Sequence, residues 1–117
     1  MFRIEGTTIT LSRGDTGEVS IGVSGYSFGS NDRALFTVRN ASNQEVKMRR
    51  ELEIVDNIVT VTFVNSDTDS LPAGRYEWDV RYVINPVYEN GQIVDGDEVI
   101  TPELPMTINL LTTVGQI

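Results

Sequence analysis

The side chains of this chain that could do chemistry are mostly carboxylates, and they gather in two short acidic segments. One contains Asp67 and Asp69, and the other contains Asp95, Asp97 and Glu98. Alternating carboxylates in a loop can converge on Ca²⁺, which takes roughly six to eight oxygen ligands. Neither segment continues into a full calcium-binding loop with its distant bidentate Glu. We therefore interpret both segments as solvated turns capped by their own Asp side chains, and we predict no metal site.

The composition argues against an enzyme. The chain of 117 residues contains no His and no Cys. This excludes Ser-His and Cys-His catalysis, imidazole or thiolate metal ligands, and disulfides. A carboxylate pair for glycoside hydrolysis would need acids facing each other across a cleft, and a small compact chain offers little cleft. We predict no enzymatic activity, no catalytic residue and no cofactor.

The charge balance restricts the partners. There are 9 Lys and Arg against 17 Asp and Glu, which gives a net charge of −8. This charge repels phosphate, so we expect no nucleic acid and no membrane as partners. No apolar run approaches the roughly 18 residues of a membrane span, and the first residues lack the apolar segment of a secretory signal. We therefore expect no signal peptide in the given chain.

Two aromatic residues are candidates for contact with a partner. Tyr26 and Phe28 lie in a segment rich in Gly, Ser and Asn, which we interpret as a loop. Aromatic side chains on a loop can act as recognition anchors. Equally, one of the two rings could tuck under the loop as a lid on the core, and the sequence leaves both alternatives open.

The uncharged end of the sequence supplies the other candidates. After Glu103 no charged residue follows, and the alternation of apolar residues breaks at Leu110 and Leu111, which must point to opposite faces of a strand. Leu111, Val114 and Ile117 could therefore pack on a neighbouring subunit or dock another protein. The alternative is a buried final strand followed by a disordered tail from Thr112.

The only basic cluster consists of Lys47, Arg49 and Arg50, and Glu51 and Glu53 follow directly. On a strand, all of these except Arg50 share the outward face. We interpret the segment as a charged edge strand that discourages aggregation, since three positive charges in a strongly acidic chain make a weak anion site.

The elements that position these residues are predicted to be strands. Val, Ile and Thr number 14, 10 and 12, against 3 Ala, and period-two alternation recurs along the chain. We expect strands within residues 8–11, 18–23, 33–39, 47–55, 58–64, 75–84 and 104–111. The residues expected to point inward are Ile9, Leu11, Val19, Ile21, Val23, Ala34, Phe36, Val38, Val59, Val61, Phe63, Tyr76, Trp78, Val80, Tyr82, Met106, Ile108 and Leu110.

Turn residues separate the expected strands. Asp56 and Asn57 predict a two-residue hairpin that pairs Val55 with Ile58, Ile54 with Val59 and Leu52 with Val61. Asn90-Gly91 is a stronger turn dipeptide with poorer flanks. We therefore interpret residues 85–98 as a long decorated loop with a partial hairpin.

The most informative segment is Leu71-Pro72-Ala73-Gly74-Arg75-Tyr76. A Leu-x-x-Gly-x-Tyr entry into a strand is typical of the corner of immunoglobulin-like domains, where the Tyr hydroxyl bonds to backbone upstream. Trp78 holds the inward position that is Cys in antibody domains. We predict an all-β fold, an antiparallel immunoglobulin-like β-sandwich of about seven strands, in one domain over residues 1–117.

Three segments carry a resemblance to a known family. They are ITLSRGDT at residues 9–16, RALFTV at residues 33–38, and the stretch from Asp67-Thr68 through LPAGRYEWDV at residues 71–80. Together they resemble the N-terminal immunoglobulin-like domain of baseplate upper proteins, from the tails of phages and prophages of Gram-positive bacteria. The resemblance spans roughly residues 7–85, and the baseplate protein continues beyond this domain.

The resemblance implies a structural assembly protein of a phage tail or baseplate that acts by protein–protein contact. Its partners would be other virion proteins or further copies of itself, and it would be made in the host cytoplasm and end in the virion. The alternative is an immunoglobulin-like module that binds carbohydrate or a surface partner.

Overall fold

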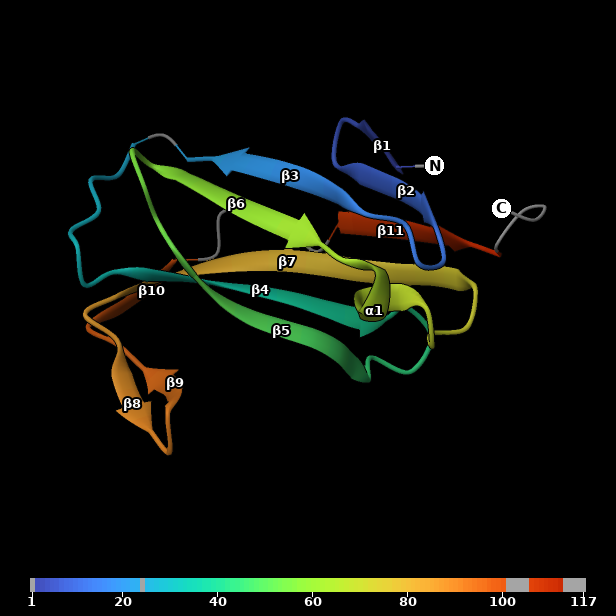
Figure 1. Ribbon diagram of the computed structural model, residues 1–117. Coiled ribbons are helices and arrows are strands. Elements are labelled where there is room, and N and C mark those ends of the chain that lie inside the picture. Colours follow the sequence, from blue (N-terminus) through green and yellow to red (C-terminus); the bar gives the residue numbers. More distant parts are fainter. Residues whose placement is uncertain (1, 24, 101–105, 113–117) are drawn as a thin grey trace.

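A computed structural model describes residues 2–23, 25–100 and 106–112 of the chain, and these residues are almost entirely β (Figure 1). They form eleven strands and one four-residue helix. The elements are β1 (Phe2–Glu5), β2 (Thr8–Ser12), β3 (Gly17–Gly22), β4 (Arg33–Asn40), β5 (Val46–Glu53), β6 (Ile58–Phe63), α1 (Asn65–Thr68), β7 (Gly74–Ile84), β8 (Val87–Glu89), β9 (Gln92–Asp95), β10 (Glu98–Ile100) and β11 (Met106–Leu111).

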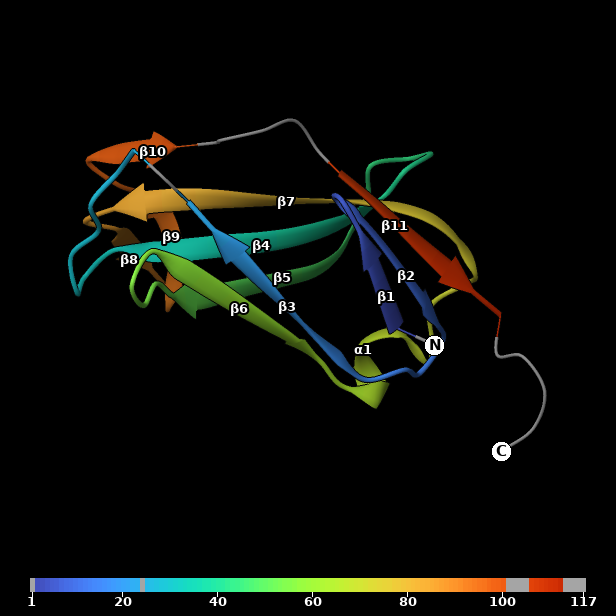
Figure 2. The same cartoon turned by 90° about the horizontal axis from the view of Figure 1, so that it is seen from above.

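The strands form two layers and a separate hairpin. Seven strands make one sheet. Six of them follow the order β1-β2-β11-β7-β4-β5, and the seventh, β10, pairs with β7 on the same edge as β11. A two-stranded sheet of β3 and β6 lies over one face of this larger sheet (Figures 1 and 2). β8 and β9 pair only with each other among the described strands, and they project from one end of the molecule.

The core lies between the two layers, and the alternation in the sequence predicts most of it. β6 alternates exposed and buried residues along its length, with Val59, Val61 and Phe63 inside. On β7, Tyr76, Trp78, Val80 and Tyr82 are all buried, as predicted. The remaining predicted inward residues are buried or half-buried against the same core: Ile9, Leu11, Val19, Ile21, Val23, Ala34, Phe36, Val38, Met106, Ile108 and Leu110.

The predicted hydrogen bond from the Tyr76 hydroxyl to the backbone upstream is confirmed. The Tyr76 hydroxyl donates a hydrogen bond of 2.7 Å to the backbone oxygen of Pro72. Two residues on, the indole Nε1 of Trp78 donates to the backbone oxygen of Thr7 at 3.1 Å. These two bonds attach β7 to the preceding turn and to the β1–β2 connection, so both polar groups are satisfied while their rings fill the core.

The predicted hairpin at Asp56 and Asn57 is correct in its turn and wrong beyond it. Both residues adopt positive φ, and Val55 and Ile58 exchange backbone hydrogen bonds of 3.0 and 2.9 Å. The pairs Ile54–Val59 and Leu52–Val61 do not form. β5 pairs with β4 and β6 pairs with β3, because the chain crosses from one layer to the other at this turn.

The prediction of purely antiparallel pairing is also wrong. β11 runs parallel to β2, from Ile108 opposite Ile9 to Leu111 opposite Ser12. Each of the seven expected strands is present, and the structure adds β1, β8, β9 and β10. The added strands are only three or four residues long, and most of their residues are exposed, so they lack the alternating apolar signal.

Candidate partner-binding surface

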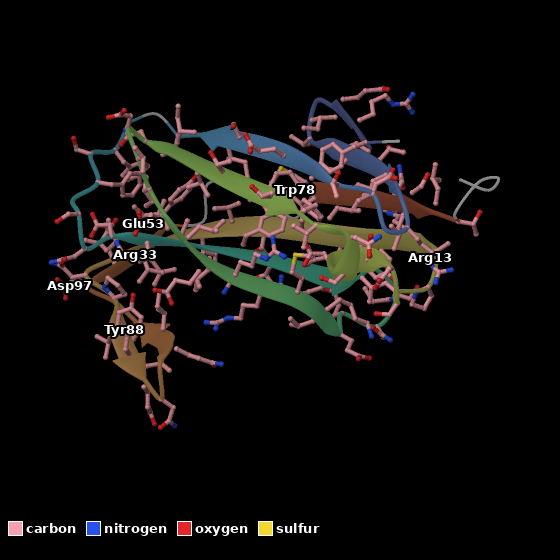
Figure 3. All side chains as sticks on the ribbon, in the orientation of Figure 1. Arg13, Arg33, Glu53, Trp78, Tyr88 and Asp97 are labelled. Carbon is pink, nitrogen blue, oxygen red and sulfur yellow. The ribbon has the colours of Figure 1, made fainter. Side chains whose placement is uncertain are left out.

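Three connections meet at one end of the molecule: the loop of residues 25–32, the turn at residues 56–57, and residues 85–98, which include β8 and β9 (Figure 1). The side chain of Asn57 donates a hydrogen bond of 2.7 Å to the backbone oxygen of Tyr26. Figure 3 shows Arg33, Tyr88 and Asp97 at this end, with Arg13 at the opposite end. Loops held on a rigid β scaffold are the usual place for binding residues, which makes this end the candidate surface.

Asp32 holds two of these connections together. It is buried, and its Oδ2 accepts a hydrogen bond of 2.7 Å from the Gly29 amide. Its Oδ1 accepts a bond of 3.0 Å from the amide of Asn85, 53 residues further along the chain. The carboxylate therefore fixes the aromatic loop against the base of the β8–β9 segment.

The two predicted aromatic residues have different environments. The Phe28 ring stacks on the buried Tyr82 ring, with centroids 5.1 Å apart, and is half-buried against the core. The Tyr26 ring stacks on the outside of Phe28 at 6.1 Å and is 46% exposed. Phe28 therefore fits the alternative of a lid on the core, while Tyr26 lies where a partner could touch it.

The expected partial hairpin of residues 85–98 is a defined element, braced on the outer face of β5. Asn90 and Gly91 form its turn with positive φ, as their dipeptide predicts. The Tyr88 hydroxyl donates to Glu51 Oε1 at 2.5 Å. Arg49 Nη2 donates to the backbone oxygen of Ile93 at 3.0 Å. The outward charges of β5 are interpreted from the sequence as protection of an edge strand against aggregation. Two of them, Arg49 and Glu51, hold the hairpin in place.

The β8–β9 hairpin and its surroundings expose apolar side chains. Val87, Tyr88, Val94 and Val99 are each about half exposed or more. A groove of about 280 Å³ runs between the hairpin and the outer face of the larger sheet. Its lining combines valines with Arg39, Arg49 and Arg81. Tyr and Arg are enriched in protein interfaces, and both residue types occur here beside exposed valines.

A buried acid pairs with one of the arginines that line the groove. Asp79 is 3% exposed, and its Oδ2 pairs with Arg39 Nη1 at 2.7 Å. Its Oδ1 has no hydrogen-bond partner within the described residues.

The hydrogen-bond acceptor of the Tyr88 hydroxyl changes its pKa. The hydrogen bond to the Glu51 carboxylate raises the pKa of Tyr88 above its usual value of 10.0, because ionisation would place two negative charges side by side. Tyr88 is therefore neutral at physiological pH and keeps the proton that it donates.

The acidic segments differ from the solvated turns interpreted from the sequence, because Asp67 lies in the short helix α1 and Asp95 ends β9. Asp67 accepts a hydrogen bond of 2.7 Å from the Val64 amide at the start of α1 and pairs with Arg50. Asp97 accepts from the side chain of Asn85 at 2.9 Å, and Asp95 accepts from the Gly96 amide at 2.8 Å. Within residues 2–23, 25–100 and 106–112, no three His, Cys, Asp or Glu side chains gather as metal ligands would.

The predicted residues near the end of the sequence are not brought together with Tyr26 and Phe28. Leu111 is half-buried at the other end of the molecule, where its backbone oxygen accepts a hydrogen bond of 3.0 Å from the Arg13 amide. Val114 and Ile117 lie outside the described residues. Asp32, Arg81 and Val94 were not predicted from the sequence as residues of this surface. For Val94, the turn residues Asn90-Gly91 between short apolar runs were a usable signal.

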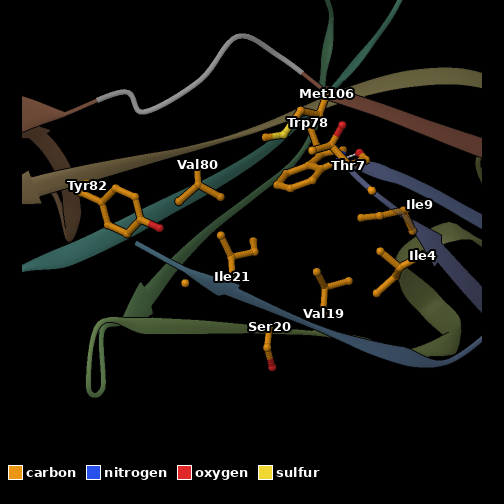
Figure 4. A pocket seen from close by; sticks show the side chains of 12 residues that line it. Ile4, Thr7, Ile9, Val19, Ser20, Ile21, Trp78, Val80, Tyr82 and Met106 are labelled. Carbon is orange, nitrogen blue, oxygen red and sulfur yellow. Dashed lines mark hydrogen bonds between the residues drawn. The ribbon is translucent and has the colours of Figure 1, made fainter. Parts of the chain in front are cut away.

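A second cavity, also of about 280 Å³, opens between the two layers beside β3 (Figure 4). Its walls come from β1, β2, β3, β7 and β11 and are mainly apolar. The buried Tyr82 hydroxyl lies in this wall and has no hydrogen-bond partner among the described residues.

A scan against protein-family models finds no match, and a search of curated proteins finds no relative. Within the described part of the chain, no helix has the length and apolar character needed to cross a membrane.

Proposed function

We propose that this chain is a non-enzymatic immunoglobulin-like domain that works by protein–protein contact through the β8–β9 hairpin and the adjoining loop end. The β8–β9 hairpin carries the proposal, because it exposes valines and a tyrosine and yet is fixed to the sheet by Arg49 and Glu51. A preorganised apolar projection loses little conformational entropy when a partner binds it.

The strand order supports the immunoglobulin-like assignment. In that fold, strands C′, C, F and G form one sheet and strands B and E belong to the other. Here β5, β4, β7 and β11 lie side by side in the order of C′, C, F and G, and β3 and β6 pair as B and E do. The Tyr76–Pro72 hydrogen bond lies at the start of β7, where the tyrosine corner precedes strand F. On this assignment the β8–β9 hairpin elaborates the connection between F and G.

The particular role that we propose is assembly of a phage or prophage tail. The support is the resemblance of residues 7–85 to the first domain of baseplate upper proteins, together with the exposed hairpin, which gives a neighbouring tail protein a surface to hold. The proposed location is the virion. If tail particles purified from the producing strain contain the chain in a fixed ratio to other tail proteins, the role is supported, and its absence from them refutes this role.

Site-specific photo-crosslinking tests the contact itself. A photoreactive phenylalanine analogue would replace Val94 on the hairpin, or Val64 near α1 at the opposite end, which is similarly exposed. Expressed in the producing cell, the chain labelled at position 94 should give a discrete protein adduct, and the chain labelled at position 64 should not. No adduct at position 94, or equal adducts at both positions, would contradict binding through the hairpin.

A further inference from the structure

The outer edge of β3 is open in the described part of the chain. β3 pairs with β6 alone among the described strands. The Val23 amide donates to the backbone oxygen of Asn57 at 3.1 Å, on the β6 side. Backbone groups of an antiparallel strand alternate between its two edges, so Gly22, Ser20 and Glu18 present their amides and carbonyls to the other edge.

This open edge forms one wall of the cavity between the layers. Gly22 lines the cavity, and because it has no side chain, it does so with its backbone. Val19 and Ile21 of β3 also line the cavity, and its other walls are mainly apolar, with Ile4, Ile9, Trp78, Val80 and Met106. An unpaired strand edge beside an apolar cavity has the two features that a sheet offers to an added strand, which are backbone partners and a pocket for a side chain.

The Tyr82 hydroxyl is a third feature of the same cavity. Tyr82 is fully buried, its hydroxyl faces the cavity in Figure 4, and the hydroxyl has no partner among the described residues. Burial raises the pKa of Tyr82, so the group stays protonated and able to donate. Leaving a buried hydroxyl without a hydrogen bond is costly, so an occupant with a polar atom at this point would be stabilised.

We propose that residues 112–117 of a second copy of this chain add as a strand to the open edge of β3, with Val114 inserted into the cavity. This assignment rests on the proposed function, since it names a partner for a domain that acts by protein contact. One occupant would then form hydrogen bonds with the β3 backbone, cover the apolar walls of the cavity and provide a hydrogen-bond partner for the Tyr82 hydroxyl.

The charge and pattern of this segment fit the site. Thr112–Ile117 has no charged side chain, whereas the chain as a whole carries −8. Glu18 is exposed on β3 itself, so a segment with acidic side chains would be repelled at this edge. In an extended strand, Thr112, Val114 and Gln116 share one face, which offers the cavity one apolar side chain flanked by two hydrogen-bonding groups.

Geometry favours a second copy over the same molecule. The cavity is lined by Met106 at the start of β11, while Thr112 follows Leu111 at its end. Returning along β11 takes about 10 Å to the level of the cavity residue Ile9, which lies opposite Ile108, and about 17 Å to Met106, at roughly 3.3 Å per residue. Crossing between the layers adds about 10 Å. Six residues span at most about 20 Å when fully extended. In the same molecule, all six residues would therefore be needed to reach the cavity, and none would remain to form a turn or to pair with β3.

The first test uses the assembly state. The full chain and a variant lacking residues 112–117 would be compared by size-exclusion chromatography with light scattering over a range of concentrations. We expect the full chain to associate with rising concentration and the shortened chain to stay monomeric with an unchanged melting temperature. Val114→Asp should abolish association, whereas Thr113→Asp, with the same charge on the opposite face, should weaken it much less. A full chain that stays monomeric throughout refutes the proposal.

The second test uses a synthetic peptide of residues 111–117, LTTVGQI, added to the shortened chain. The chain has a single Trp, and Trp78 lines the cavity, so its fluorescence reports binding there. Tyr82→Phe should weaken peptide binding about threefold to tenfold, the effect of one hydrogen bond, and should raise the melting temperature of the empty domain.

Tyr76→Phe is the matched control, because the Tyr76 hydroxyl bonds to Pro72 rather than facing the cavity. It should lower the melting temperature and leave peptide binding unchanged. No binding at millimolar peptide, or equal losses from both tyrosine variants, overturns the strand-addition site. Neither result affects crosslinking at position 94, so failure here and failure of the proposed function can be told apart.

Discussion

Replacing Asp32 by Ala tests how the loop end is held together. The buried carboxylate accepts one hydrogen bond from the Gly29 amide and one from the Asn85 amide. These two bonds connect the loop of residues 25–32 with the segment that leads into β8. The substitution removes both acceptors and leaves every strand intact.

The expected loss follows from those two bonds. A hydrogen bond to a charged group contributes roughly 1.5–3 kcal/mol. Gly29 and Asn85 are exposed residues, so their amides can regain part of this from water once the carboxylate is gone. We therefore expect Asp32→Ala to lower the free energy of unfolding by about 2–3 kcal/mol, a large fraction of the roughly 5–15 kcal/mol that a domain has.

Urea unfolding followed by Trp78 fluorescence measures this loss, and hydrogen exchange at the Gly29 and Asn85 amides locates it. Asn31→Ala is the control, since Asn31 is exposed on the same loop, and it should change stability by no more than about 0.5 kcal/mol. If Asp32→Ala is no more destabilising than Asn31→Ala, Asp32 does not hold the two connections together, and the reasoning fails.

Trp78→Ala removes a buried ring that packs on Phe36 and should cost about 3–5 kcal/mol by urea unfolding followed by circular dichroism; a melting temperature within a few degrees of the parent would contradict its burial. The Tyr88 hydroxyl should titrate above 10.0 by ultraviolet absorbance, and Glu51→Gln should bring its pKa back toward that value. Because the folded pKa is raised, the Tyr88–Glu51 contact stabilises the hairpin fully below the ordinary tyrosine pKa, and this contribution disappears as pH rises through the raised value. Millimolar Ca²⁺ should leave the melting temperature unchanged, because Asp67 is already bonded to Arg50 and the Val64 amide, and a rise that Asp67→Asn removes would show a site after all.

The faces of the strands and several turns were predictable from sequence. Val59, Val61 and Phe63 alternate with polar neighbours, and such alternation assigns residues to the inner or outer face regardless of which strand lies beside them. The Tyr76 corner was predictable because Pro72 and Gly74 determine a local conformation only a few residues long. Asn90-Gly91 was predictable for the same reason.

Strand pairing was not predictable in the same way. The two-residue turn at Asp56 and Asn57 was correct, yet the hairpin that it implied does not extend, because β5 and β6 belong to different layers. The parallel pairing of β2 with β11 joins residues about a hundred positions apart. A period of two in the sequence specifies which face of a strand is buried. It does not specify which strand lies beside it, so the pairing is decided only when all the layers pack together.

The candidate sites show the same division. The sequence by itself determined the absence of His and Cys, the acidic charge, the all-β pattern and the position of Tyr26 and Phe28 on a loop, but not which of the two rings is exposed. Only the tertiary structure decided that Asp32 is buried while Asp95 and Asp97 are exposed, and that the Tyr82 hydroxyl faces a cavity. The physical reason is that a side chain's hydrogen-bond partners and its access to water depend on segments distant in the chain, which no local pattern encodes.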